Sequence, residues 1–237
     1  MKKTYSPKGS SAPPDAIPEL TSARSKKPTL STGTGDKGTT GLFCGGRVAK
    51  TDFQIIATGD CDELSAALGI AKAAAKVEIE SGTRLDLAAN TKLNDKQTFQ
   101  HIVKLIGAVQ LDLITIMGDI SLNRYTESGK HFSLDSARVT WIEEIGALIE
   151  SVLPKQTGWE LAGENSVEAA LQLARTICRR AERSALAVPD AHRASNATLL
   201  YLNRLSDLLM LLGRYANYFA VQPLNNAAAV NISKLLG

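Results

Sequence analysis

Three arginines recur at helical spacing in the segment 166–186: Arg175, Arg179 and Arg183. At about 100° per residue they fall on one stripe of an amphipathic helix, together with Glu182. Like charges four residues apart on a helix repel each other, so this stripe requires anions beside it. Guanidinium groups match phosphate oxygens with paired hydrogen bonds, which favours a site for a polyanion. A solvated basic face, partly neutralised by Glu182, is an equally good interpretation of this helix alone.

A second segment suited to phosphates lies at 32–41 and reads TGTGDKGTTG. It contains the pattern G-x-G-x-x-G, but no apolar strand precedes it and no helix follows it, so a dinucleotide-binding turn is excluded. What remains is a loop rich in backbone N–H and hydroxyl donors with Lys37 in its middle, which is chemically suited to wrapping phosphates. A flexible surface loop is the alternative, and composition alone favours it.

A helix is predicted over 60–76, with Asp60 as its cap and Glu63 three residues later, as in a capping box. Asp62 would then lie in the first turn, where the helix dipole stabilises a carboxylate. Only a partner arginine would give Asp62 a further role.

The last long helix is predicted over 194–222 and is apolar nearly all round, which indicates that it is buried. Buried polar groups need partners, so its one polar stripe faces either the charges of another helix or a bound ligand, and both interpretations stay open. The stripe consists of Asn203, Asp207, Arg214 and Asn217.

Apolar residues at helical spacing predict two more helices, over 97–121 and 135–153, while 77–95 is a loose connection or a frayed helix end. No strand pattern is convincing, so the predicted fold is all-α: an antiparallel five-helix bundle with a disordered N-terminal tail. The expected organisation is a basic tail at 1–28, the bundle at 29–222 and a C-terminal tail at 223–237.

Composition limits the function. A net charge of +3 gives no support to nucleic-acid binding. The three cysteines, Cys44, Cys61 and Cys178, form no CxxC pair and indicate an intracellular reducing compartment. Three scattered histidines make a His-based metal centre improbable, and no apolar run is long enough to span a membrane. The basic, Ser-rich start leaves two alternatives, a plain tail in a cytoplasmic protein or targeting to the mitochondrial matrix.

Taken together, the motifs resemble the PduO-type ATP:cob(I)alamin adenosyltransferases, which include the human mitochondrial enzyme. The matching residues follow the order and spacing of that family from about 30 to 220. They are the loop 34–40, Arg47 and Lys50, Asp62-Glu63-Leu64, Arg179-Arg180-Ala181-Glu182-Arg183, and the run 201–207.

The resemblance implies a homotrimer with sites between subunits, a corrinoid reductase as partner, and Mg²⁺ with the substrates ATP and cob(I)alamin. It implies transfer of the 5′-deoxyadenosyl group of ATP to cob(I)alamin, with release of triphosphate. Arg183, Arg179 and Asp62 would be the catalytic residues, with Asp62 meeting Arg179 across an interface, and Trp159 would stand where the family has a Phe near the corrin. The implied ATP-binding residues are Thr32, Gly33, Thr34, Gly35, Asp36, Lys37, Gly38, Thr40, Gly41, Lys50, Arg179, Arg180, Ala181, Glu182, Arg183 and Asn203.

Four positions depart from the family pattern: Gly33 replaces a cation, Ile56 a Glu, Ala162 a Pro and Glu164 a Gly. Losing a cation beside phosphates removes about 1.5–3 kcal/mol of charge-assisted bonding. The alternative function is therefore a divergent member that binds ATP or cobalamin without efficient transfer, and a purely structural trimeric bundle is a third.

Overall fold

The structure is a computed structural model that describes residues 32–42, 45–81, 84–86, 91–93, 96–122, 133–221 and 226–236. The chain divides into two compact units, 1–37 and 38–237. In the first, residues 32–37 form a turn in which the Asp36 N–H donates to the Gly33 carbonyl at 3.3 Å. Gly33 has φ 68°, a left-handed conformation in which glycine carries no steric cost. The predicted tail 1–28 lies outside the described residues.

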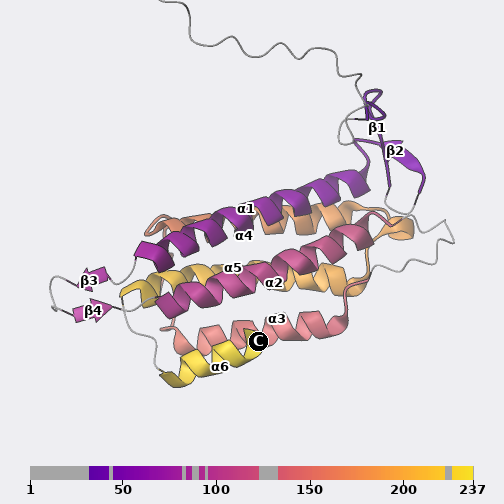
Figure 1. The fold of residues 1–237 in the computed structure, drawn as a ribbon. Coiled ribbons are helices and arrows are strands. Elements are labelled where there is room, and N and C mark those ends of the chain that lie inside the picture. Colours follow the sequence, from indigo (N-terminus) through magenta and orange to yellow (C-terminus); the bar gives the residue numbers. More distant parts are fainter. Residues whose placement is uncertain are drawn as a thin grey trace, which may run out of the picture. The chain divides into compact units, whose positions relative to one another are not determined.

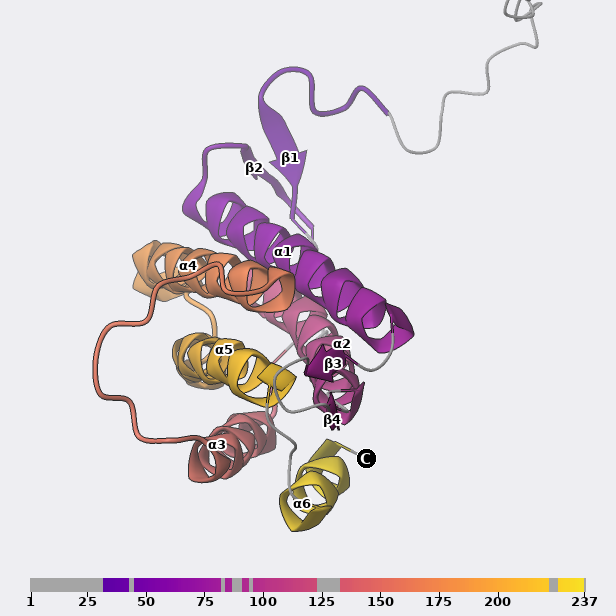
Figure 2. The ribbon, with the colours of Figure 1, turned by 90° about the vertical axis from the view of Figure 1, so that its left-hand side faces the viewer.

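Five long helices form the second unit, and successive helices run in opposite directions (Figure 1). Seen end-on, α5 lies beside α3 and α4, and α1 lies beside α4 and α2 (Figure 2). The predicted all-α antiparallel bundle is confirmed. The helices are α1 (Phe53–Ser81), α2 (Lys96–Ile120), α3 (Ser136–Val152), α4 (Ser166–Ala187) and α5 (Asn196–Val221).

Helix α1 begins earlier than predicted, at Phe53 instead of Asp60. Its first turn is held by Asp52, whose side chain accepts from the Gln54 N–H at 2.9 Å. The buried face already includes Ala57, so Asp60 lies inside the helix and does not cap it. The capping-box interpretation of Asp60 and Glu63 was wrong, and Asp62 is not in a first turn.

The chain after 222 was expected to be a tail, yet it contains a sixth helix, α6 (Asn226–Leu236). This helix contacts α2 and α3 and buries Ile232. Its backbone is also tied to the bundle, because the Trp141 indole N–H donates to the Leu235 carbonyl at 3.1 Å. The missed signal was the short apolar pattern of Ile232, Leu235 and Leu236.

Two small antiparallel hairpins were also not predicted. Strand β1 (Thr39–Gly41) pairs with β2 (Arg47–Ala49), and β3 (Arg84–Asp86) pairs with β4 (Thr91–Leu93) inside the segment expected to be a loose connection. Strands of three residues are too short to show an alternating pattern in a sequence.

Helix α2 is the most apolar of the described helices and the one among them that is long and apolar enough to cross a membrane. In the bundle it packs against α1, α5 and α6. Its buried side chains include Phe99, Ile102 and Leu113, which makes it a core helix.

Polar groups are also buried between α2, α3 and α5. Arg138 donates to both oxygens of Asp112, at 2.9 and 2.7 Å, and the Tyr201 hydroxyl donates to the same carboxylate at 2.6 Å. Burial, and then the adjacent Asp112 carboxylate, raise the pKa of Tyr201 well above its usual value, so the hydroxyl remains a donor. Both oxygens of the Asp112 carboxylate therefore accept hydrogen bonds within this cluster.

Candidate functional site

Helix α4 carries the arginine stripe, and its start is fixed by Asn165. The Asn165 side chain accepts from the N–H groups of Val167 and Glu168, which is the geometry of an N-cap. Further along the helix, Arg179 and Arg183 are exposed. Neither side chain makes a hydrogen bond or ion pair with any part of the chain that the structure describes. The two guanidinium groups are therefore available to an anion from outside the subunit.

Arg180 differs from its neighbours because it faces α1. Its guanidinium bonds Asp60 at 3.2 Å and also pairs with Glu63, and the Ser184 hydroxyl donates to the other oxygen of Asp60. We call these four residues the α1–α4 clamp. Because successive residues of a helix are rotated by about 100°, Arg179 lies about 100° from Arg180 around the helix and Arg183 about 60° from it, both on the same side. Arg180 was expected among the ATP-binding residues, and in the structure its guanidinium is engaged with α1 of the same subunit.

Asp62 projects from α1 in a different direction from Asp60. It is exposed and has no partner in the described ranges. Within one subunit Asp62 is not paired with Arg179, and the expected ion pair is one with another subunit. That pairing stays a prediction.

Asn203 on α5 sits in a chain of polar contacts. Its amide donates to Glu182 at 2.8 Å and accepts from Arg204 at 2.6 Å, while Arg204 also bonds Glu143 at 2.8 Å. Glu182, an expected ATP-binding residue on α4, is thus hydrogen-bonded to α5. Ala181, also expected among the ATP-binding residues, is fully buried. These contacts orient the Asn203 side chain.

The segment 153–165, between α3 and α4, covers one side of a cavity of about 570 Å³. Its walls bring together Arg175 and Arg179 of α4, Asp207 and Met210 of α5, and Trp159 of the segment. Trp159 is fully exposed, and Asp207 has no partner among the described residues. Sequence patterns had separated these groups into a basic stripe, a polar stripe and a lone aromatic. Met210 was missed, because it counted as part of an apolar helix.

A profile of the cobalamin adenosyltransferase family matches residues 30–216. The corrinoid adenosyltransferase of Mycobacterium tuberculosis is 37% identical over 191 residues, which cover 78% of this chain and 87% of that protein. The chain belongs to the cobalamin adenosyltransferase family. The corrinoid adenosyltransferase of Homo sapiens is 30% identical over 200 residues, covering 84% and 73%.

Solved structures agree with this placement. A variant of the PduO-type ATP:corrinoid adenosyltransferase from Lactobacillus reuteri, complexed with cobalamin and ATP, superposes with a TM-score of 0.67. It is 26% identical, and the match covers 82% of this chain and 94% of that one. The family predicted from the ordered motifs is confirmed.

The expected ATP-binding residues outside α4 and α5 lie in both units. Residues Thr32–Lys37 belong to the first unit, whereas Gly38, Thr40, Gly41 and Lys50 belong to the second. In the second unit, the Lys50 N–H donates to the Gly38 carbonyl at 2.9 Å and closes the β1–β2 hairpin. Gly38 has φ 78°, which favours glycine there. The Lys50 side chain is exposed, as a phosphate-binding lysine must be.

The cysteines of the described residues contribute packing. Cys61 and Cys178 are free and fully buried. Burial, and then the charge of Asp60, raise the pKa of Cys61 to about 12. Burial also raises the pKa of Cys178, so both stay protonated thiols and are unsuited to metal binding or nucleophilic attack.

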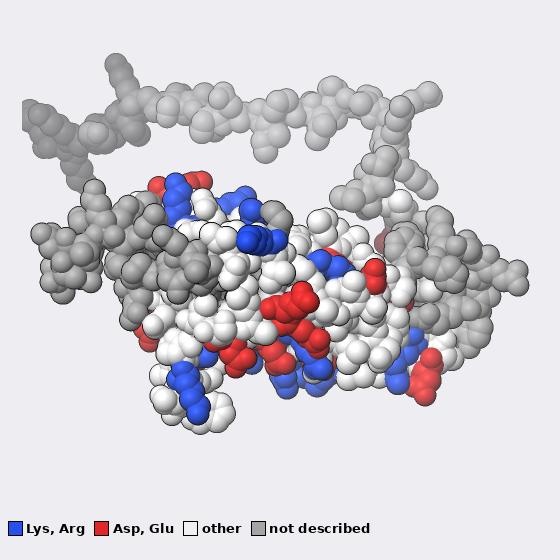
Figure 3. Space-filling model, turned by 90° about the horizontal axis from the view of Figure 1, so that it is seen from below, with Lys and Arg blue, Asp and Glu red and all other residues white. Residues whose placement is uncertain are grey.

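Charge is mixed on one face of the molecule. On the face seen in Figure 3, basic and acidic side chains alternate with uncharged surface and no large area of one sign forms. This pattern gives no support to a nucleic-acid interface.

Proposed function

We propose that this protein transfers the 5′-deoxyadenosyl group of ATP to cob(I)alamin, giving adenosylcobalamin and triphosphate. The electron pair of Co(I) forms the bond to C5′, the C5′–O bond breaks, and triphosphate leaves with the electron pair of the C5′–O bond. Membership in the family supports this activity, and relatives carry the name corrinoid adenosyltransferase. The observation that carries the proposal is Arg179, which lines the same cavity as Trp159, together with Arg183 one helical turn further along α4. Both side chains are exposed and have no partner among the described residues.

The chemistry needs no general base, because cob(I)alamin is itself a strong nucleophile. The protein must hold C5′ in line with cobalt and stabilise the charge that develops on the triphosphate. Arg179, Arg183 and Lys50 supply fixed positive charge for that task, and the loop 32–38 supplies backbone N–H donors. Asn203, oriented by Glu182 and Arg204, supplies an amide for the nucleotide.

Trp159 serves the corrinoid. Cob(II)alamin must lose its lower axial ligand before it can be reduced, and a bulky apolar side chain beside the corrin favours the form without that ligand. The fully exposed indole on the 153–165 segment can take that place. An electron donor, a corrinoid reductase, then supplies the electron.

Magnesium is the expected metal ion. The described residues contain no group of three His, Cys, Asp or Glu side chains that could hold an ion. Mg²⁺ is commonly bound by substrate phosphates, waters and one or two carboxylates. Asp207, an exposed carboxylate that lines the same cavity as Arg179, is a candidate ligand for it.

We infer assembly as a homotrimer from the family resemblance, and the face of α1 that the subunit leaves exposed supports it. The outer face of α1 exposes small and apolar residues, and from Ala66 to Val77 they recur at spacings of four, three and four, a pattern typical of helix pairing. Asp62 lies beside this face, and a second copy would bring its own unpaired arginines to that carboxylate. The exposed residues are Ile56, Gly59, Ala66, Ile70, Ala73 and Val77.

The direct test is an adenosylation assay with ATP and chemically reduced cobalamin, followed by the absorbance of the cobalt–carbon product. Product formation is expected from a protein that sediments as a trimer. Binding of ATP and cobalamin without product would select the divergent, non-transferring member instead. That alternative has a specific basis, because Gly33 and Ile56 replace charged residues of the family pattern. A monomer at micromolar concentration would count against the intersubunit site.

A further inference from the structure

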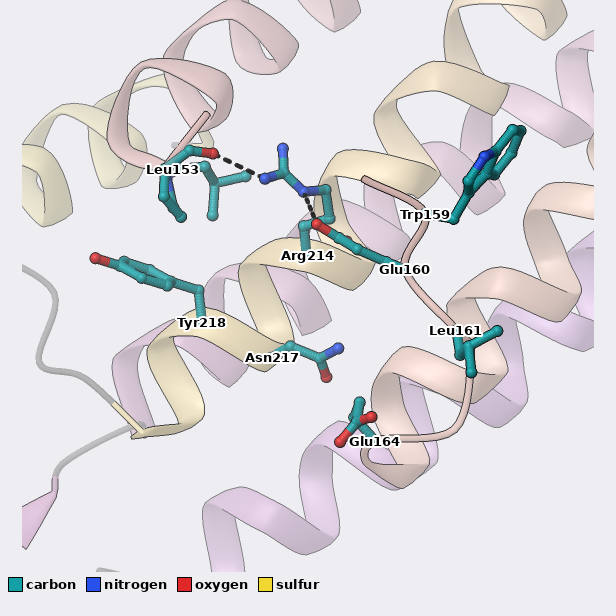
Figure 4. Close-up of a pocket in the computed structure, with 9 residues that line it drawn as sticks. Leu153, Trp159, Glu160, Leu161, Glu164, Arg214, Asn217 and Tyr218 are labelled. Carbon is teal, nitrogen blue, oxygen red and sulfur yellow. Dashed lines mark hydrogen bonds and ion pairs between the residues drawn. The ribbon is translucent and has the colours of Figure 1, made fainter. Parts of the chain in front are cut away.

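The 153–165 segment stands between two cavities. One is the cavity that contains Arg179; the other, of about 460 Å³, lies toward the ends of α3 and α5. Figure 4 shows this second cavity, with Arg214 between the end of α3 and Glu160, and with the Trp159 ring pointing away from Arg214. The segment therefore does not rest on a packed core at Trp159, and its position depends on individual contacts.

Arg214 makes the contacts nearest to Trp159. Its Nε donates to Glu160 at 2.9 Å and its Nη2 donates to the Pro154 carbonyl at 2.8 Å. The Arg214 side chain is only 10% exposed, whereas that of Glu160 is 41% exposed. A buried guanidinium with two acceptors has a defined orientation, because its donors form a rigid planar fork. Arg214 thus ties both the start of the segment and the neighbour of Trp159 to α5.

The other attachments lie further along the chain. The Gly163 N–H donates to Glu168 at 2.7 Å, and Asn165 donates to Asn217 at 2.5 Å. Gln156 bonds only within the segment, to the Gly158 carbonyl. Trp159 itself makes no hydrogen bond with the described part of the protein and is fully exposed. Between Pro154 and Gly163, Glu160 is therefore the one side chain of the segment that the described contacts fasten to the bundle.

We propose that Arg214 is a positioning residue that, through Glu160 and the Pro154 carbonyl, holds Trp159 at the mouth of the Arg179 cavity for the corrinoid step. This inference rests on the proposed function. Without the bonds from Arg214 to Glu160 and to the Pro154 carbonyl, several residues of the segment are free to move at once. A displacement of about 1 Å at a reacting centre is enough to lower the rate by up to a hundredfold. The arginines of α4 keep their places, because Arg180 and Asn165 fix that helix independently.

The variant Glu160→Gln tests the proposal with little risk to folding, because Glu160 is on the surface. Glu164→Gln is the matched control: it removes an exposed carboxylate from the same segment, and Glu164 has no partner in the described ranges. Arg214→Lys keeps the charge but cannot reproduce the forked pair of bonds. All three are compared with wild type in the full-length protein.

Two readouts separate positioning from folding. Hydrogen exchange of the peptide that covers 154–163 reports the attachment of the segment without any turnover. The second readout is the absorbance of bound cob(II)alamin, which reports the fraction without its lower axial ligand. Turnover is measured in addition, both from cob(II)alamin with a reductant and from pre-reduced cob(I)alamin. In Glu160→Gln and Arg214→Lys we expect faster hydrogen exchange of this peptide. We also expect about a tenfold loss both of the cob(II)alamin fraction without its lower axial ligand and of turnover from cob(II)alamin with a reductant. The KM for ATP should be nearly unchanged. Glu164→Gln should behave as wild type.

Unchanged exchange in both variants would overturn the attachment, and faster exchange with wild-type behaviour toward cob(II)alamin would reduce Arg214 to a structural role. An equal loss in KM for ATP would also contradict the proposal, because it would indicate a general disturbance of the site. Failure of the wild type to adenosylate cob(I)alamin would instead overturn the proposed function and, with it, this inference.

Discussion

Two clusters of charged residues occupy opposite sides of the bundle and are built on different principles. Between α2, α3 and α5, the Asp112 carboxylate accepts from Arg138 and Tyr201, and its side chain is 11% exposed. On α1 and α4, by contrast, Asp62, Arg179 and Arg183 are exposed without partners in the described chain. We call the first group the closed cluster, because its residues bind one another and stabilise one subunit. We call the second the open cluster, because its residues remain available to ligands or other subunits.

The α1–α4 clamp explains how the open cluster can exist. Three like charges on one helix stripe destabilise an isolated helix, and an arginine beside them would ordinarily add to the repulsion. Here Arg180 is neutralised by Asp60 and Glu63 within the subunit. The clamp therefore stabilises α4 against α1 while Arg179 and Arg183 keep their charge for a polyanion. We infer that variants in the closed cluster and the clamp change stability, whereas variants in the open cluster change function.

The largest expected effect is that of Asp112→Ala. Removing the carboxylate leaves Arg138 partly buried without its partner and the Tyr201 hydroxyl without an acceptor. Breaking a buried pair in this way costs about 3 kcal/mol in the free energy of unfolding. Urea unfolding of the variant and the wild type measures it. A loss below about 1 kcal/mol would mean that this cluster is as dispensable as a surface ion pair.

The second prediction concerns the open cluster. An arginine aimed at the leaving triphosphate strengthens its interaction as charge develops, so it lowers the barrier more than it tightens ground-state binding. Arg183→Ala should keep the assembly and most of the ATP affinity but lose turnover by about a hundredfold. Arg179→Ala should weaken assembly and ATP binding together, because Asp62 of another subunit is its expected partner. Steady-state kinetics and light scattering check both variants, and normal turnover of Arg183→Ala would contradict this division of roles.

The sequence predicted the fold class and the family because both rest on patterns spread over the chain. Apolar periodicity located all five long helices, and four of their starts fall within two residues of prediction. The start of α1 was missed because Asp60 and Glu63 mimic a capping box, while their true partner, Arg180, is 120 residues away. Long-range pairing of this kind leaves no local signal. The convergence of Trp159, Asp207 and Met210 on one cavity could not be predicted for the same reason.

The third prediction concerns pH and the attachment of α6. The His101 ring contacts the Tyr215 hydroxyl at 3.0 Å and Ser233 of α6 at 2.9 Å. Burial, and then the charge of Lys104, lower the pKa of His101 from 6.5 to about 4. The unfolded chain therefore binds more protons than the folded chain between these values, so stability falls as pH falls from 6.5 toward 4. At about pH 4.5 this loss amounts to about 2 kcal/mol.

The variant His101→Gln isolates this contribution, because Gln retains hydrogen-bonding groups but does not titrate. Urea unfolding at about pH 7 and about pH 4.5 should show a smaller difference for the variant than for the wild type. An identical difference in both proteins would mean that the free energy of unfolding does not depend on a neutral His101.

The smallest effect is expected for Ser184→Ala, which tests the clamp itself. The variant removes the hydroxyl that donates to Asp60 but leaves the ion pair between Asp60 and Arg180. A hydrogen bond to a charged group contributes about 1.5 kcal/mol, and the remaining partner of Asp60 reduces that loss to about 1 kcal/mol.

Because Ser184 lies one residue beyond Arg183, a ligand-binding role for this helix edge would lower ATP affinity in the same variant. The clamp interpretation requires the opposite: reduced stability in urea unfolding, and an unchanged KM for ATP at a temperature where the variant is fully folded. A fall in ATP affinity without a fall in stability would contradict the clamp interpretation, because Ser184 would then act in ligand binding together with Arg179 and Arg183.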